Sequence, residues 1–218
     1  MLAYLVARGG VPVLRDEVAE ALWPDGDRAQ VEHLLSNAAY YLRRTLKSAV
    51  AGTDVQAFVT SAQRYHLRSG AFRVEADAFD AHLRRAESLQ GAEALLEYDR
   101  ALSIYRGDFL RNEPYEWAEP YRREYERRFI EAAHRAAKLA VDCRDATKAM
   151  AFYSAILSRD PIDEEAARGL MRCYSKLGDV NGVRKVYKVL TESLRRELED
   201  EKAEPLPETT VLMQELIR

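Results

Sequence analysis

The chain has 218 residues, of which 47% are hydrophobic and 32% charged, a composition typical of a helical globular protein with one or two domains. Its formal net charge is −3, so the overall field does not favour nucleic acid, and any nucleic-acid binding requires a local basic face. No apolar run of about 18 residues is present, so we expect no membrane span and a cytoplasmic protein. The two cysteines, Cys143 and Cys173, lie in helical patterns and are expected to be reduced and buried.

The first 70 residues predict three helices followed by a β-hairpin. A short helix over residues 2–7 stops at two glycines, and residues 11–13 form an extended connector. A second helix covers 14–22, with one apolar face made of Leu14, Val18, Ala21 and Leu22. A third helix covers 28–47, and the chain breaks at residues 52–54.

Aromatic and β-branched residues in 56–60 and 64–68 then predict two short strands around a turn at 61–63. Three helices followed by a hairpin is the order of a winged helix-turn-helix. We therefore predict a winged-helix DNA-binding domain over residues 1–70.

After a link at residues 71–76, the chain shows helical patterns and no strand pattern. Glycines and prolines separate the helices from one another. The predicted helices cover 78–88, 91–105, 115–142, 146–158, 163–177, 180–199 and 207–217. The fold class is therefore mainly α, with a second domain over residues 71–218.

An internal repeat organises this second domain. Three pairs of similar or corresponding residues are 34 positions apart: Asp145 and Asp179, Ala149 and Val183, and Tyr153 and Tyr187. Thirty-four is the period of tetratricopeptide repeats, whose stacked helix pairs form binding surfaces. The repeat predicts a domain that binds a macromolecule or a signal.

Five segments, in this order, resemble the bacterial transcriptional activator domain, which is the tetratricopeptide-like domain of SARP-type regulators. They are 76–79 (ADAF), 101–110 (ALSIYRGDFL), 116–120 (EWAEP), 160–165 (DPIDEE) and 204–208 (EPLPE). The resemblance spans almost all of residues 76–218. It implies transcription regulation without a cofactor, and a protein partner such as the transcription machinery or a sensor domain.

Residues 1–70 resemble the winged helix of the OmpR/PhoB type that precedes this domain in the family. Residues 14–24 and 42–46 carry the resemblance. The family's winged helix opens with a small β-sheet before its first helix, whereas this chain begins inside that helix. We therefore expect either a fragment of a longer protein or a degenerate domain.

The third helix supplies the candidate DNA-binding face. Its apolar side is predicted to consist of Val31, Leu34, Leu35, Ala38, Leu42, Thr45 and Leu46. On the flank of the polar side Asn37 would read adenine, and on the polar side itself Tyr40 would contact a sugar or a thymine methyl group. Three cations would grip phosphates: Arg43, Arg44 and Lys47.

At the tip of the hairpin, Arg64 would enter a minor groove as a wing residue. The alternative interpretation of the third helix is an ordinary amphipathic surface helix. The family resemblance favours DNA binding, but the family carries arginines where this chain has Ser36 and Tyr41. Each missing phosphate contact weakens binding.

No enzymatic motif appears in the sequence. The four histidines are scattered and none pairs at a metal-ligand spacing, so we expect no metal site. Neither a phosphate-binding glycine loop nor a nucleophile motif is present. We predict a DNA-binding transcriptional regulator, or its C-terminal regulatory fragment, whose helical domain mediates self-association as a homodimer and partner contact. The alternative is a tetratricopeptide-like interaction or sensor module of a larger signalling protein that does not bind DNA.

Overall fold

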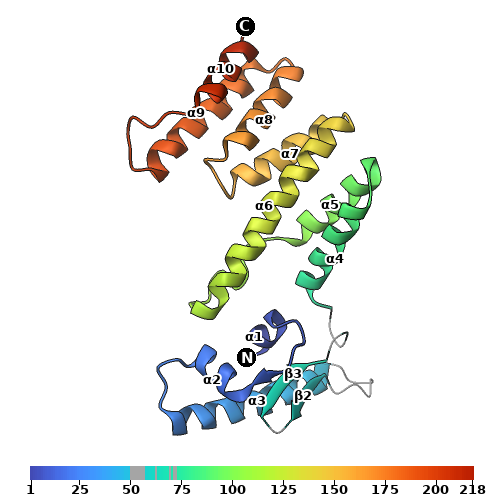
Figure 1. Cartoon of the computed structure of the whole chain (residues 1–218), viewed down its shortest axis with the longest axis vertical. Helices are drawn as coiled ribbons and strands as arrows, with labels where there is room; N and C mark the ends of the chain where they lie inside the picture. Colours follow the sequence, from blue (N-terminus) through green and yellow to red (C-terminus); the bar gives the residue numbers. More distant parts are fainter. Residues whose placement is uncertain (50–56, 62, 69, 71–72) are drawn as a thin grey trace. The chain divides into compact units, whose positions relative to one another are not determined.

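The computed structural model describes residues 1–49, 57–61, 63–68, 70 and 73–218 (Figure 1). The predicted chain break at 52–54, strand residue Gln56, turn residue Ala62 and link residues 71–72 lie outside this part. The chain divides into two compact units. The first unit contains residues 1–78 and 107–125, and the second contains residues 79–106 and 126–218. The partition into domains 1–70 and 71–218 stays a prediction.

The first unit contains three helices and a three-stranded antiparallel sheet. Its helices are α1 (Leu2–Ala7), α2 (Arg15–Leu22) and α3 (Arg28–Ala49), and its strands are β1 (Val13–Leu14), β2 (Phe58–Ser61) and β3 (Arg64–Leu67). The strand order is β1-β3-β2, so β3 is central. The predicted helices and both hairpin strands are present, with ends shifted by one or two residues.

The predicted connector at residues 11–13 is partly wrong, because its last residue begins a strand. Val13 pairs with Tyr65 of β3, and Leu14 pairs with Arg64. Because side chains alternate along a strand, Val13 is fully buried while Leu14 is 46% exposed. Leu14 therefore does not belong to the apolar face of the second helix, as the sequence had indicated.

Helix α3 buries one continuous stripe against the core of the first unit. The stripe consists of Val31, Leu35, Ala39, Leu42 and Leu46. Three residues predicted for this side lie elsewhere: Leu34 and Ala38 are half-buried, and Thr45 is exposed. Steps of three and four residues keep Ala39 in line with its neighbours, and this places Ala38 and Thr45 on the shoulders of the helix.

The segment 107–125 belongs to the first unit although almost thirty residues separate it from residue 78. Trp117, in the 3₁₀ helix η1 (Glu116–Ala118), packs edge-on against Tyr4 of α1 with ring centroids 5.0 Å apart. Arg122 fixes the preceding loop, because its guanidinium donates to the carbonyls of Phe109, Leu110 and Glu113 at 2.9, 2.9 and 2.6 Å. The helix predicted over residues 115–142 thus begins with the 3₁₀ helix η1, and its α-helical part starts at Glu119.

The remaining helices match the predicted pattern closely. They are α4 (Glu75–Ser88), α5 (Gly91–Ile104), α6 (Glu119–Asp142), α7 (Ala146–Leu157), α8 (Glu164–Lys176), α9 (Val180–Glu197) and α10 (Pro207–Leu216). In the second unit, α7, α8 and α9 pack in succession, and α10 contacts both α8 and α9 (Figure 1). None of the described helices is long and apolar enough to cross a membrane.

Residues 34 positions apart occupy equivalent places in α7 and α9. Asp145 caps α7 by accepting from the backbone N–H of Lys148 at 3.0 Å, and Asp179 caps α9 by accepting from Gly182 at 2.8 Å. The residue before each cap has a left-handed backbone, with φ of 59° at Arg144 and 75° at Gly178. The repeat seen in the sequence thus has a local structural counterpart.

Tyrosine rings seat neighbouring helices against one another. The ring of Tyr153 on α7 lies where a Cβ on Gly169 of α8 would be only 2.2 Å away. The ring of Tyr174 on α8 bears the same relation to Gly182 of α9, at 2.4 Å. Each glycine therefore allows an aromatic ring to lie directly on the next helix.

Helix α10 is held to α8 by a carboxylate that is only 12% exposed. Glu164 accepts from the backbone N–H of Leu206 at 3.0 Å and from the hydroxyl of Thr209 at 2.5 Å. Arg168 donates to the same Thr209 oxygen at 2.8 Å and pairs with Glu208 at 3.0 Å. Two segments that carry the family resemblance, 160–165 and 204–208, therefore meet at this point.

The cysteines differ in their environments. Cys173 is buried in α8, as expected, and burial raises the pKa of its thiol. Cys143 is exposed, contrary to expectation, because it follows the last residue of α6. The sequence placed it in a helical pattern that had already ended.

Candidate nucleic-acid interface

The outer face of α3 is a stripe of polar and aromatic side chains. At 100° per residue, His33, Asn37, Tyr40, Arg44 and Lys47 lie opposite the buried stripe, and all five are exposed. The structure thus brings four of the six predicted site residues onto one helix face. Such a face can enter a major groove only if it is open, and these side chains project from the first unit.

Arg44 and Lys47 are the two cations of this face. Within the described part of the chain, no carboxylate pairs with either side chain. Helix α3 carries four basic residues and one acidic residue, Glu32. Lys47 lies in the last turn, where the helix dipole favours a positive charge. The C-terminal half of α3 is therefore a local positive surface on a chain whose net charge is negative.

Asn37 and His33 form a linked pair one turn apart. The Nδ2 atom of Asn37 lies 3.0 Å from the Nε2 atom of His33, and both side chains are exposed. The histidine ring thereby orients the amide of Asn37. An oriented, exposed amide carries both a donor and an acceptor, which is the pattern that reads adenine.

Tyr40 and Tyr41 form an exposed aromatic pair. Their rings meet edge to face with centroids 5.5 Å apart, and they are 55% and 62% exposed. Tyr41 was not among the predicted site residues. The sequence signal that could have identified Tyr41 is a pair of adjacent aromatic residues on the polar side of an amphipathic helix.

Arg43 lies against the sheet, unlike its neighbour Arg44. Its guanidinium donates to the hydroxyl of Thr60 on β2 at 3.1 Å and lies 5.7 Å from the ring centroid of Phe58. Both contacts join α3 to the hairpin. The guanidinium of Arg43 is therefore engaged within the first unit, whereas that of Arg44 is not held by these contacts.

Arg64 opens β3 at the hairpin turn. Its backbone pairs with Ser61 of β2 and Leu14 of β1, and its side chain is exposed. The neighbouring carbonyl of Gln63 accepts from the backbone N–H of Arg15 at 2.9 Å, which anchors the turn to the start of α2. Arg64 is therefore an exposed cation on a fixed hairpin.

A groove of about 620 Å³ lies at the N-terminal end of α3. Its charged lining is mixed, with basic Arg15 and Arg28 beside acidic Asp16, Glu20 and Glu32. Because opposite charges alternate there, the groove does not favour phosphate as the C-terminal half of α3 does. The described residues also contain no cluster of three His, Cys, Asp or Glu residues that could hold a metal ion.

Comparison with protein families decides the class of the chain. The model of the bacterial transcriptional activator domain matches residues 74–217, well over half of the sequence. This chain belongs to the bacterial transcriptional activator domain family. The match to the activator domain contains all five segments that carried the resemblance. It begins after β3, so the candidate site residues on α3 and at the hairpin precede it.

A solved structure extends the likeness beyond the activator domain. The chain is similar to Mycobacterium tuberculosis EmbR, which was solved in complex with a low-affinity phosphopeptide, with a TM-score of 0.74 and 19% identity. The alignment covers 99% of this chain and 59% of that chain, so this chain spans less than two thirds of the length of EmbR. At this identity the likeness shows the fold. No curated protein matches the sequence.

Proposed function

We propose that this activator-domain protein is a DNA-binding transcription regulator in which α1 to β3 form a winged helix-turn-helix and α3 is the recognition helix. The observation that carries the proposal is the exposed stripe of α3, which combines Asn37 with Arg44 and Lys47, two cations that pair with no carboxylate of the described residues. It lies opposite the buried stripe of α3, so the helix is held firmly while its outer face stays open. The order of elements supports the same interpretation.

Each residue then has a distinct role. Arg44 and Lys47 grip phosphates, which gives affinity without sequence preference. Asn37 reads a base edge, and Tyr40 contacts a sugar or a thymine methyl group. Arg43 positions the hairpin through Thr60.

Arg64 acts as the wing residue that enters the minor groove. The helices from α4 onward form a tetratricopeptide-like unit for self-association and for contact with a protein partner. In this arrangement α3 recognises the promoter DNA, and the helical unit recruits the protein partner.

Fluorescence anisotropy with a labelled duplex from the gene's own upstream region tests the proposal. We expect Arg44→Ala to weaken binding and to reduce the slope of log K against log salt by about 0.9, the loss of one phosphate contact. Arg43→Ala should weaken binding with little change in slope, because its guanidinium is held by Thr60 and Phe58. Arg84→Ala, an exposed arginine on α4, is the matched control and should change neither quantity.

Failure of the full chain to bind this duplex at about 50 mM salt would reject DNA binding. The second candidate function is a tetratricopeptide-like interaction or sensor module that does not bind DNA. It is favoured by Ser36 and Tyr41, which stand where the winged-helix family that residues 1–70 resemble carries arginines. Absence of duplex binding, together with binding of a helical peptide that depends little on salt, would support this second function.

A further inference from the structure

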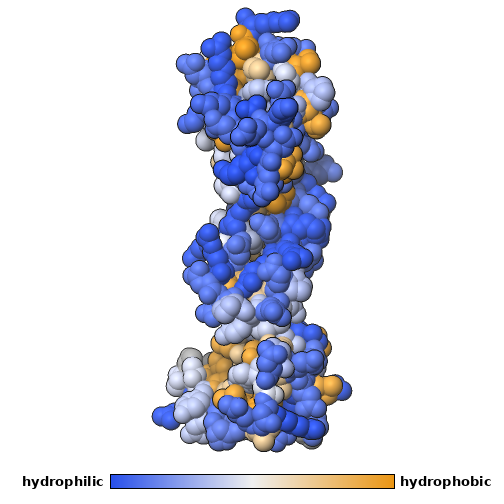
Figure 2. All heavy atoms as spheres, turned by 90° about the vertical axis from the view of Figure 1, so that its left-hand side faces the viewer, coloured by the Kyte–Doolittle hydropathy of each residue, from blue (hydrophilic) through white to orange (hydrophobic). Residues whose placement is uncertain are grey.

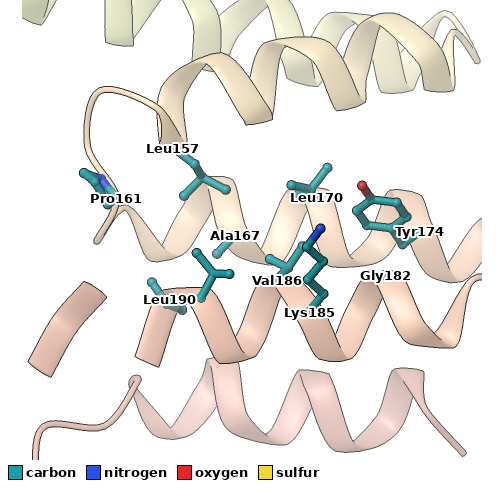
Figure 3. Close-up of a pocket in the computed structure, with 10 residues that line it drawn as sticks. Leu157, Pro161, Ala167, Leu170, Tyr174, Gly182, Lys185, Val186 and Leu190 are labelled. Atoms are coloured by element: carbon teal, nitrogen blue, oxygen red, sulfur yellow. The ribbon is translucent and has the colours of Figure 1, made fainter. Parts of the chain in front are cut away.

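An apolar groove lies in the second unit between the end of α7, α8 and α9 (Figure 3). It has a volume of about 200 Å³. Its floor is made of buried side chains from two neighbouring helices: Leu170 of α8 and Val186 and Leu190 of α9. Its rim includes Val189, which is 49% exposed. The floor is thus fixed by packing, whereas the rim is open to a partner.

Two polar groups interrupt this apolar lining. Lys185 rises from α9 beside Val186, and Tyr174 closes the end of the groove on α8 (Figure 3). In the described part of the chain, no carboxylate pairs with Lys185 and no group hydrogen-bonds to the hydroxyl of Tyr174. By contrast, Lys188 on the next turn of α9 lies 3.7 Å from a carboxylate oxygen of Glu192. The groove therefore offers one free cation and one free hydroxyl.

The charge of α9 indicates which kind of partner fits. The helix carries five basic residues and two acidic ones, on a chain whose net charge is −3. Hydrophobic side chains also emerge among hydrophilic ones on the C-terminal helices at the upper end of Figure 2. An acidic, apolar partner is attracted to this surface, whereas a basic one is repelled.

The size of the groove favours side chains over a whole small molecule. Ligand pockets typically measure about 300–1,000 Å³, which is larger than this groove. An apolar groove lined by two neighbouring helices instead suits the apolar face of a partner helix, with its anchors at i, i+3, i+4 and i+7. A carboxylate beside those anchors would meet Lys185.

We propose that this groove binds an acidic amphipathic helix of a protein partner. The apolar side chains of that helix lie on Leu170, Val186 and Leu190, and one of its carboxylates pairs with Lys185. This inference rests on the proposed partner-contact role of the helical unit and gives the chemistry of the partner. It does not depend on DNA binding by α3.

Synthetic peptides titrated into the full-length chain test this proposal by fluorescence anisotropy. The probe is a set of fluorescein-labelled helical peptides of about 16 residues, with leucines at i, i+3, i+4 and i+7 and glutamates beside them in varied register. The matched set carries lysines in place of the glutamates. We expect saturable binding of glutamate peptides and none of lysine peptides.

Two variants and two matched controls locate the binding site. Lys185→Glu should weaken binding of the glutamate peptides about fivefold, and Val189→Asp should weaken it about tenfold. Arg184→Glu makes the same charge change one residue away, and Val211→Asp makes the same apolar-to-acidic change on α10; neither lines the groove. All four positions are exposed, so their urea midpoints should stay close to that of the parent chain.

Equal weakening by Lys185→Glu and Arg184→Glu would overturn the proposal, because attraction would then be general to α9. Absence of binding across the whole glutamate set would also overturn it. Arg44→Ala should leave peptide binding unchanged, and Lys185→Glu should leave DNA binding unchanged. Loss of one activity without the other therefore distinguishes failure of the groove from failure of the α3 interface.

Discussion

The carboxylate of Glu164 is expected to be the main attachment of α10, and Glu164→Ala tests this. The side chain is 12% exposed and accepts from Leu206 and Thr209. Hydrogen bonds to a charged group contribute about 1.5–3 kcal/mol each. Leu206 is exposed, so water can replace its partner, and the Thr209 hydroxyl keeps its contact with Arg168. We therefore expect a loss of about 2–3 kcal/mol in the free energy of unfolding, below the simple sum.

The matched control is Glu165→Ala, one residue along the same first turn of α8. Glu165 is half exposed and pairs with Lys138 at 2.7 Å, so its removal should cost less than about 1 kcal/mol. Both variants lose the same favourable interaction with the helix dipole, which therefore cancels in the comparison.

Urea unfolding should be followed by far-ultraviolet circular dichroism, because both tryptophans, Trp23 and Trp117, lie in the first unit. Hydrogen exchange should also show faster exchange of the α10 amides in Glu164→Ala alone. Equal unfolding free energies of the two variants, with unchanged α10 protection, would refute the attachment.

Two further predictions concern the second unit. Arg144→Gly should raise the free energy of unfolding by about 0.5–1 kcal/mol, because exposed Arg144 holds a left-handed backbone that its equivalent Gly178 adopts without strain. Gly178→Arg should lower the free energy of unfolding for the same reason. A lower urea midpoint for Arg144→Gly than for the parent chain would contradict this prediction. The hydrogen bond to Asp163, at 2.7 Å, raises the pKa of His134, so its stabilisation is full below pH 6.5 and is lost as pH rises through the higher folded pKa. His134→Gln should therefore cost about 1–2 kcal/mol at pH 5.5 and less at pH 9, measured by urea unfolding at both values, and an equal cost would contradict the ion pair.

Local signals explain why the helices were predictable. Asp145, Asp163 and Asp179 each cap a helix through a backbone N–H three residues on, and a sequence shows this spacing directly. The strand at Val13 was not predictable in the same way. This strand contains two residues and exists because β3 lies beside it, and their paired residues are 50 and 52 positions apart in the chain.

The candidate site was predictable to the extent that it lies on one helix. The periodicity of α3 placed Tyr40 and Arg44 on its outer face and Asn37 on the flank of that face. It misassigned the inner stripe, which contains Ala39 in place of Leu34, Ala38 and Thr45. The link from Arg43 to Thr60 joins two elements and needs the tertiary structure. The apolar groove was likewise beyond the sequence, because neighbouring helices supply its two sides.

The packing of residues 107–125 with residues 1–78 has a consequence for biosynthesis. Trp117 completes the surroundings of Tyr4, so the N-terminal unit cannot finish folding when its own first segment leaves the ribosome. It must wait while α5 is made, and closing that long loop carries an entropic cost. A gene fragment that ends at residue 78 omits part of this unit. Any exchange of the N-terminal unit between related genes must therefore carry residues 107–125 with it.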